Sequence, residues 1–355
     1  MPFFNSPMTS PDIIIIGAGA FGLATAAELR LAGHKVTVVA PDTPSASAVA
    51  AGMIAPAMEA AIDGLPIHVG DMLKMSRMLW DVFANRTGID LQEMPAEWRG
   101  EGAERLMLQM QRHDFAHSYD AAAQQLITDA DAKVDPVTAL EAMGQGIERI
   151  NATAEAVFRE GDLWMVATSE GVVSAPKLVL ATGAAGAIVG LPDAVTRIID
   201  SITPIRGLIG ITHERLSDHV LRGPGAYVAP VNGGPYAGGS VIGATMESGV
   251  RDLEPDMERC EAMLAAAWKI LGQTPRDIEI EWRAGVRGAS ADGLPLVGDV
   301  GNGLFVALAP RRNGWLLAPL VASQLRAEIE GKSVTERAFD PFRVLSPSDR
   351  SGFRP

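Results

Sequence analysis

Cysteine is almost absent from this chain, which has only Cys260 among its 355 residues. A single cysteine excludes an internal disulfide framework and a metal site built from cysteines. Acidic residues flank Cys260 in a helical pattern and would raise the pKa of its thiol, so we interpret it as an unreactive packing residue. A reducing, cytoplasmic setting is the expectation that follows.

Positive charge and long apolar runs are also scarce. The 30 lysines and arginines are outnumbered by 43 acidic residues, giving a formal net charge of −13, which argues against general binding to nucleic acid or anionic membranes. A small anionic substrate remains compatible, because local arginines act within a Debye length of about 8 Å. No stretch reaches the roughly 18 apolar residues of a membrane helix. Residues 1–12 lack the positive charge and apolar core of a signal peptide.

Glycine, in contrast, is abundant, with 37 residues, and the first cluster follows a buried-strand pattern. Ile13–Ile16 is a continuous β-branched run, as expected of a strand covered on both faces of a parallel sheet. The turn GAGAFG at 17–22, a helical pattern at 23–31 and a second β-branched run at 35–39 complete one βαβ unit of about thirty residues.

The three glycines of that turn have separate physical roles. Gly17 permits the tight turn, Gly19 lets the backbone approach a pyrophosphate, and Gly22 allows close packing of helix on strand. The helix N-terminus then offers unpaired N–H groups to the phosphates. The context of strand, helix and second strand favours a dinucleotide site over a glycine-rich turn without a ligand.

The acid that normally binds the ribose is missing at the end of the second strand. Val39 is followed by Ala40 and Pro41, and Asp42 lies about twenty residues beyond the last glycine of the turn. Asp42 either reaches the ribose after a bend at Pro41 or caps the next turn at the surface.

Two features favour FAD over NAD as the dinucleotide. A second glycine-rich strand end, Ala181-Thr182-Gly183, returns late in the chain, while the turn at 17–22 stands close to the N-terminus. The small-residue segment 45–56 also takes the place of the βαβ repeats with which a nicotinamide enzyme normally continues.

The remaining pattern alternates helices and strands, without internal repeats. A mixed helical and irregular stretch is expected at 91–143, a β-rich section at 205–246, and a hairpin between 227–231 and 240–245. Predicted helices span 69–88, 255–271 (with Pro255 in its first turn) and 313–331, and predicted strands span 156–158, 163–168, 171–180, 277–282 and 304–308.

Several stretches resemble the D-amino-acid oxidase superfamily of FAD enzymes, most closely the glycine oxidases of thiamine biosynthesis. They are IIIIGAGAFGLATAAEL (13–29), SAVAAGMIAP (47–56), LVLATGA (178–184), GATM (243–246), and WRAGVRGASADGLPLVG continuing into FVALAPRRNGWLLAP (282–319). The resemblance implies an α/β fold with a Rossmann-like FAD-binding domain and a β-rich antiparallel substrate domain. By this likeness, residues 12–90, 150–204 and 288–345 form the FAD-binding domain, and residues 91–149 and 205–287 form the substrate domain.

The resemblance also implies a set of cofactor contacts. Ala20 and Phe21 would lie at the pyrophosphate beside the turn glycines, and Ala40 and Pro41 would lie at the adenosine ribose. Asp42, from its spacing, and Gly183, from the later glycine-rich strand end, are added to these contacts. Small residues would lie along the flavin, and the segment from Arg312 would reach the isoalloxazine from its other side. The complete set is Gly17, Gly19, Ala20, Phe21, Gly22, Ala40, Pro41, Asp42, Ala46, Ser47, Ala51, Gly52, Met53, Gly183, Arg312, Asn313, Gly314, Trp315 and Leu316.

Four residues are implied to contact substrate. Arg287 occupies the family's position for the substrate carboxylate, for which a bidentate guanidinium is well suited. Arg312 occupies a second carboxylate-side position, and Tyr227 and Met246 match pocket-lining positions. The alternatives are an ion pair between Arg287 and Asp292, and plain strand packing for Tyr227 and Met246.

The chain departs from the family pattern at three places. Ala309-Pro310 stands where the family usually has Gly-His, Arg287-Gly288 stands where it has Arg-Pro, and the ribose acid is missing. Arg283 continues the polar face of its predicted strand, so we expect it to be solvated. The histidines form no metal-ligand pattern, and no metal is expected.

The reaction implied by the resemblance is oxidation of the C–N bond of a small amino acid, such as glycine, sarcosine or a D-amino acid. Hydride transfer to FAD would give an imino acid, and dioxygen would accept the electrons to form hydrogen peroxide. No dedicated side-chain base is expected. Two other functions stay open: a dehydrogenase that passes electrons to a non-oxygen acceptor, and a flavin-binding protein without turnover. Substrate and oligomeric state also remain open.

Overall fold

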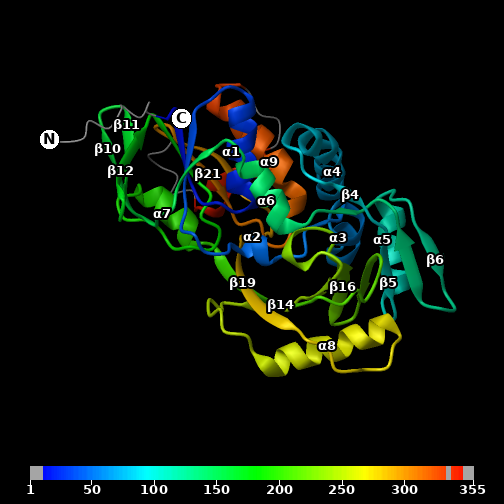
Figure 1. The fold of residues 1–355 in the computed structure, drawn as a ribbon. Helices are drawn as coiled ribbons and strands as arrows, with labels where there is room; N and C mark the ends of the chain where they lie inside the picture. The colour runs from blue at the N-terminus through cyan, green and yellow to red at the C-terminus, as the bar shows by residue number, and fades with distance from the viewer. Residues whose placement is uncertain (1–10, 333–336, 347–355) are drawn as a thin grey trace.

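The computed structural model describes residues 11–332 and 337–346 and has an α/β fold built from a parallel sheet and a mostly antiparallel sheet (Figure 1). The strands are β1 (Ile13–Ile16), β2 (Val36–Val39), β3 (Met53–Ile54), β4 (Gln92–Glu93), β5 (Ala96–Arg99), β6 (Ser118–Asp120), β7 (Gln125–Thr128), β8 (Ala132–Lys133), β9 (Glu148–Ile150), β10 (Ala154–Glu160), β11 (Leu163–Thr168), β12 (Gly171–Ala175), β13 (Lys177–Leu180), β14 (Thr203–Thr212), β15 (Val220–Gly223), β16 (Ala226–Pro230), β17 (Ser240–Gly243), β18 (Glu247–Ser248), β19 (Glu281–Ala289), β20 (Leu296–Gly301) and β21 (Leu304–Leu308). The helices are α1 (Ala20–Leu31), α2 (Ala46–Val49), α3 (Pro56–Asp63), α4 (Ile67–Thr87), α5 (Ala103–Arg112), α6 (Pro136–Gly144), α7 (Asp193–Asp200), α8 (Met257–Leu271) and α9 (Gly314–Ile329), with short 3-10 turns η1 (Gly234–Tyr236) and η2 (Pro341–Val344).

The parallel sheet has the order β20-β21-β13-β1-β2-β9, with β20 antiparallel to β21. Strand β1 lies at its centre and pairs in parallel with β2 and β13. Successive side chains of β1 point to opposite faces. Ile13 and Ile15 therefore pack into the core that contains α1 and α9, while Ile14 and Ile16 pack into the core that contains α7. This two-sided burial explains why the strand is entirely β-branched and apolar.

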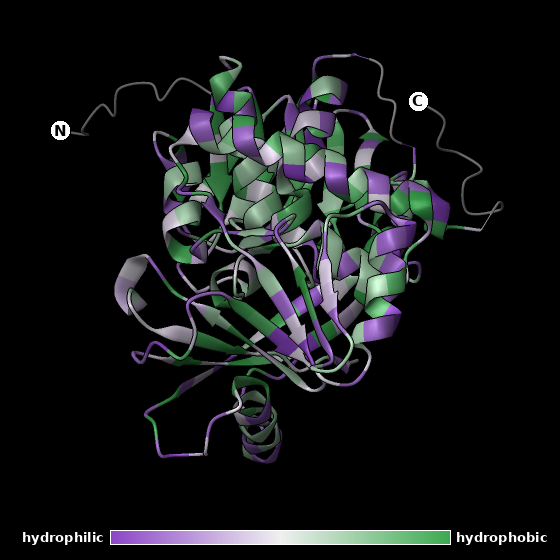
Figure 2. Ribbon diagram, turned by 90° about the vertical axis from the view of Figure 1, so that its right-hand side faces the viewer, coloured by the Kyte–Doolittle hydropathy of each residue, from purple (hydrophilic) through white to green (hydrophobic). Residues whose placement is uncertain are grey.

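The second sheet carries the predicted hairpin, because β16 and β17 pair antiparallel with Tyr227 opposite Gly243. Helix α8 covers the outer face of this sheet, in the lower part of Figure 1 and of Figure 2. Cys260 of α8 is buried in the core between them. The inner face packs on α2 through Ile209 and Ile211. Short helix α2 therefore lies between the two sheets, where the site described below is found.

Four local expectations need correction. The strand expected at 171–180 is broken into β12 and β13, since Pro176 has no N–H to donate to a sheet. Pro255 lies outside α8, which begins after the N-cap Asp256. Residues 277–282 show the expected alternation of exposure, but hydrogen-bonded strand begins only at Glu281. The stretch 91–143, expected to be mixed helical and irregular, contains helix α5 and most of α6, but it also contributes β5, β6 and β7 to the antiparallel sheet.

Three of the boundaries expected between the two domains fall inside strands and not in connecting loops. Those at 149/150, 204/205 and 287/288 fall inside β9, β14 and β19 respectively. Each of these strands runs without a break across the expected boundary. Residues 333–336 of the expected FAD-binding domain lie outside the described residues, as do residues 1–10 of the segment compared with a signal peptide. Within residues 11–332 and 337–346, no helix is long and apolar enough to cross a membrane.

Candidate functional site

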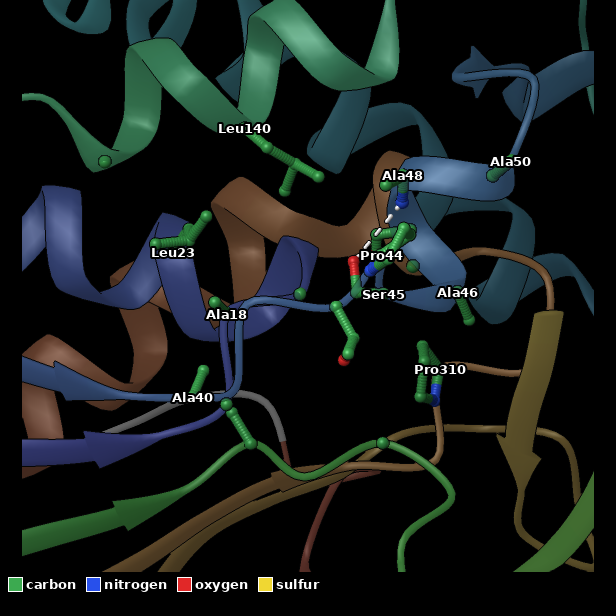
Figure 3. Close-up of a pocket in the computed structure, with 18 of the residues that line it drawn as sticks. Ala18, Leu23, Ala40, Pro44, Ser45, Ala46, Ala48, Ala50, Leu140 and Pro310 are labelled. Atoms are coloured by element: carbon green, nitrogen blue, oxygen red, sulfur yellow. Dashed lines mark hydrogen bonds between the residues drawn. The ribbon is translucent and has the colours of Figure 1, made fainter. Parts of the chain in front are cut away.

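A cleft of about 1120 Å³ lies between the carboxyl ends of the parallel strands and the antiparallel sheet. Its volume exceeds the roughly 300–1,000 Å³ of ordinary small-molecule sites, which suits an elongated ligand. Figure 3 shows apolar side chains from separate parts of the chain around this space, among them the small residues Ala18, Ala40 and Ala46 and the larger Leu140 and Pro310. Small side chains leave room for a ligand to approach the backbone closely.

The glycines of the first turn are required by close backbone contacts. Gly17 has φ +116°, and a Cβ on it would lie 2.2 Å from the carbonyl oxygen of Ala181. A Cβ on Gly22 would lie 2.0 Å from the carbonyl oxygen of Gly17. The predicted roles of these two glycines in turn formation and helix packing therefore have a direct steric basis.

Two helix N-termini are exposed to the cleft. The N-caps of α1 and α9, Gly19 and Asn313, make no side-chain capping hydrogen bond. Ser47 of α2 connects the two helices, because its Oγ accepts from the Ala20 N–H at 3.0 Å and its carbonyl accepts from Trp315 Nε1 at 3.2 Å. Free N–H groups at a helix N-terminus favour bound anions, so this end of the cleft suits a phosphate or an anionic ring.

The end of the cleft beside β2 lacks a buried acid. Ala40 lines it, and the Asp42 side chain is 84% exposed. Arg149 of the neighbouring strand β9 also lines it, donating from Nη2 to the Pro41 carbonyl at 3.0 Å and lying 3.9 Å from Asp42. This end therefore presents an arginine and a solvated carboxylate together.

Arg287 of β19 lines the cleft from the antiparallel sheet and is half-buried. Burial lowers the pKa of its guanidinium, against the influence of Tyr227 and Glu59, which raise it. Its Nη1 donates a long hydrogen bond of 3.4 Å to the Thr245 carbonyl. Asp292, the alternative partner, is instead paired with Arg343 at 2.8 Å. No acidic side chain of the described residues lies within ion-pair distance of Arg287.

Tyr227 and Met246 differ in their relation to this arginine. Tyr227 packs on Gly243, where a Cβ would lie 2.3 Å from the phenol oxygen. Burial raises the pKa of Tyr227, while the positive charge of Arg287 opposes that rise, so the phenol is a neutral donor. Met246 is 41% exposed, and neither side chain belongs to the wall of the cleft.

Arg312 lines the cleft but is also held by acids of α3. Its Nε lies 2.5 Å from Glu59 and its Nη2 2.9 Å from Asp63. Glu59 also accepts from Arg222 at 2.8 Å, and Asp63 pairs with Arg311 at 2.8 Å. Burial alone would raise the pKa of Glu59, but Arg312 and Arg222 hold it below its ordinary value.

Asp131 lies beside this cluster and is almost fully buried. Its Oδ1 accepts from the Ala57 N–H at 2.9 Å in the first turn of α3. Burial raises the pKa of Asp131 to about 7, against the lowering influence of Arg222. The carboxyl therefore changes charge near neutral pH.

The cleft brings many of the expected cofactor residues together. Those in its wall are Gly17, Gly19, Ala40, Pro41, Asp42, Ala46, Ser47, Gly183, Arg312, Gly314 and Trp315. The others, Ala20, Phe21, Gly22, Ala51, Gly52, Met53, Asn313 and Leu316, lie outside that wall. Of the expected substrate residues, Arg287 and Arg312 belong to it.

Sequence reasoning missed the part of the wall that comes from α6 and β9. Val137, Leu140 and Glu141 of α6 and Arg149 of β9 line the cleft, although no local motif marks them. Arg283 was expected to be solvated, but it lines the cleft with 32% of its side chain exposed. It pairs there with Glu281 and donates to the Tyr236 hydroxyl at 2.8 Å.

The residues present fit a dinucleotide. A Cβ on Gly17 or Gly22 would clash with neighbouring backbone, so only glycine permits this tight turn, and two helix N-termini without side-chain caps lie at the cleft. No group of three or more His, Cys, Asp or Glu side chains is placed to hold a metal ion in the part of the chain that the structure describes.

Comparison with known proteins agrees with this geometry. The sequence model of a family described as FAD dependent oxidoreductase matches residues 12–327. The bifunctional protein ThiO/ThiG of Trichormus variabilis is 28% identical over 88% of this chain, which spans about half, 51%, of that relative. The glycine oxidase of Pseudomonas aeruginosa is 25% identical, with 94% of this chain and 97% of the relative covered. Among solved structures, glycine oxidase from Geobacillus kaustophilus superposes with a TM-score of 0.79 at 21% identity, covering 95% of this chain and all of that chain.

Proposed function

Because the chain belongs to the family of FAD-dependent oxidoreductases, we propose that it oxidises the C–N bond of a small amino acid held by Arg287. Bound FAD supplies the hydride acceptor, so the products are an imino acid and, after reaction with dioxygen, hydrogen peroxide. The glycine turn, α2 and the start of α9 would hold the cofactor. Glycine, sarcosine and D-amino acids are the proposed substrates.

The observation that carries this proposal is that Arg287 is half-buried and has no acidic partner among the described residues. Burial of a guanidinium without an acidic partner costs free energy, and a bound anion would offset that cost. A carboxylate matches its planar pair of donors in geometry and charge. Tyr227, neutral because burial raises its pKa, is close enough to Arg287 to interact electrostatically and is proposed to assist at the substrate side.

The start of α9 is proposed to stabilise negative charge that develops during the reaction. Gly314 and Trp315 line the cleft, and the helix N-terminus carries a partial positive charge. In this proposal the chain binds and orients the substrate, and no side chain acts as a general base. Placing reacting groups in a productive geometry can remove about 7–11 kcal/mol of the barrier.

The test is an anaerobic titration of the FAD-loaded protein with glycine, sarcosine, D-alanine and D-proline, following the long-wavelength flavin absorbance. Bleaching by at least one of them supports the proposal, whereas a flavin that stays oxidised with the whole panel contradicts it. Arg287→Ala should weaken kcat/KM by an amount equivalent to roughly 2–5 kcal/mol. Arg276→Ala, at an exposed ion pair with Glu214, is the matched control.

Air-saturated buffer then separates an oxidase from a dehydrogenase. Fast reoxidation of the bleached protein with hydrogen peroxide release supports dioxygen as the acceptor. Slow reoxidation in air, with fast reoxidation by an artificial quinone, supports the dehydrogenase instead. A role in thiamine biosynthesis is the most specific form of the proposal and requires glycine to be among the substrates.

A further inference from the structure

Five arginines line the cleft, and they differ in whether an acid neutralises them. Arg311 and Arg312 share Asp63, which lies 2.8 Å from the first and 2.9 Å from the second. Arg283 pairs with Glu281, and Arg149 lies 3.9 Å from Asp42. Among the cleft arginines of the described chain, Arg287 is the one without an acid within ion-pair distance.

The acids that neutralise Arg311 and Arg312 come from one face of α3. Glu59 and Asp63 are four residues apart, so they lie one above the other on the helix surface. Glu59 is 8% exposed and the Asp63 side chain 15% exposed. Ion pairs this far from water are weakly screened and persist at physiological salt.

Arg222 does not alter the balance of positive and negative charge on the cleft side of this cluster. It pairs with the other oxygen of Glu59 and donates to the Met53 sulfur, and it lies behind the cleft wall. Asp131 lies within electrostatic reach of Arg222 and offsets part of its charge.

We propose that Glu59 and Asp63 determine the substrate class, by neutralising Arg312 and Arg311 so that the site accepts amino acids with one carboxylate and disfavours those with two. This inference rests on the proposed function. A second carboxylate would meet arginines whose charge is already balanced, and it would have to lose its hydration next to Glu59 and Asp63. Dicarboxylic amino acids therefore gain no second ion pair in this site.

Sarcosine and iminodiacetate form the matched substrate pair, since both are N-substituted glycines and only iminodiacetate carries a second carboxylate. We expect the wild-type protein to favour sarcosine in kcat/KM. Glu59→Gln and Asp63→Asn, each of which leaves Arg312 short of one acid, should shift the kcat/KM ratio about 10- to 100-fold toward iminodiacetate. This range corresponds to one charge-assisted hydrogen bond.

A reversal variant separates a freed arginine from a general disturbance of the site. Adding Arg312→Gln to Asp63→Asn should return the ratio toward the wild-type value. Asp81→Asn, which breaks the exposed ion pair with Arg77 on α4, is the matched control and should leave the ratio unchanged. A ratio that does not move in folded, FAD-loaded Asp63→Asn protein overturns the proposal, as does a shift of equal size in Asp81→Asn.

Binding of non-oxidisable anions tests the inference without turnover or variants. Acetate and malonate are titrated into the wild-type holoprotein, and their Kd values are read from the change in flavin absorbance. We expect malonate to gain no more than the statistical factor of about two. Malonate binding tenfold tighter than acetate would overturn the inference even if both α3 variants failed to fold. Failure of the proposed function looks different: no amino acid bleaches the flavin, whatever the ratio of the two Kd values.

Discussion

Gly207 of β14 leaves the space that the Arg287 guanidinium occupies, because a Cβ at residue 207 would lie 2.1 Å from Arg287 Nη1. The two residues come from neighbouring antiparallel strands, on which Ile205 is the direct partner of Arg287 and Gly207 that of Gly285. A glycine in the middle of a strand ordinarily weakens it. At this position it makes room for the cation that the proposed function requires.

Gly207→Ala is therefore expected to displace the Arg287 side chain while the protein still folds. The clashing atoms are the far end of a flexible side chain, so the strands themselves need not move. Affinity for acetate, measured from flavin absorbance, should fall about tenfold or more, as expected for loss of a charge-assisted hydrogen bond. Gly186→Ala, at an exposed glycine with open space around it, is the control. Unchanged acetate affinity in Gly207→Ala would show that Arg287 is not the anion site.

Gly22→Ala is expected to destabilise the protein and prevent FAD binding. In an ordinary helix, replacing glycine by alanine stabilises by about 1 kcal/mol. In α1 the added Cβ would lie 2.0 Å from the Gly17 carbonyl oxygen, and both atoms belong to rigid backbone. We expect a loss of about 3 kcal/mol in the free energy of unfolding, measured with urea. A stability equal to or above that of the wild type would show that the turn is looser than the contact implies.

Arg149→Ala is expected to weaken FAD binding at the adenosine end. Arg149 holds the Pro41 carbonyl and approaches Asp42, in the place where a ribose-binding acid is missing. Loss of one such hydrogen bond should raise the Kd for FAD about tenfold in fluorescence titrations of the apoprotein. FMN lacks the adenosine and should bind the variant and the wild type equally.

Glu148→Ala is the control for that experiment, because the neighbouring Glu148 accepts from the Thr37 hydroxyl at 2.8 Å and lies outside the cleft wall. Asp42→Asn tests the alternative ribose contact. If Asp42→Asn alone weakens FAD binding, the ribose is held by the carboxylate and not by the arginine.

Asp131 is expected to make stability depend on pH. Burial raises its pKa from 3.8 to about 7, so the folded chain binds this proton more tightly than the unfolded chain does. The contribution of Asp131 to the free energy of unfolding therefore decreases as the pH rises from about 4 to about 7, and stays low above that. Asp131→Asn keeps the oxygen that accepts from Ala57 and removes the titration. The stability gained by Asp131→Asn should be greater at pH 8 than at pH 5, by roughly 1–3 kcal/mol in urea unfolding. An equal effect at both pH values would contradict the raised pKa.

The first βαβ unit could be predicted almost residue by residue, because its signals are local. The β-branched run Ile13–Ile16, the glycine turn and the start of α1 each follow from sterics that neighbouring residues decide. The hairpin of β16 and β17 was likewise visible from two β runs around a glycine-rich turn. The FAD cofactor and the oxidoreductase family are confirmed.

The features that sequence reasoning missed depend on contacts between distant segments. Arg149 lines the cleft only because β9 adds to β2 after more than a hundred intervening residues. The acids of Arg312 come from α3, about 250 residues earlier, and no spacing rule connects them. Sequence likeness could nominate Arg287 and Arg312 together, but only the fold shows that one is neutralised and the other is not.

The wall of the cleft joins residues 17–50, 137–149, 181–184, 283–288 and 310–315. During synthesis the helix that begins at Gly314 emerges last of these segments, so the growing chain has no complete cleft until this helix has left the ribosome. A nucleotide that binds the folded chain and not the unfolded one stabilises the fold by mass action, so added FAD should raise the stability of this protein. Riboflavin supply should thus govern how long this protein survives proteolysis as well as how fast it works.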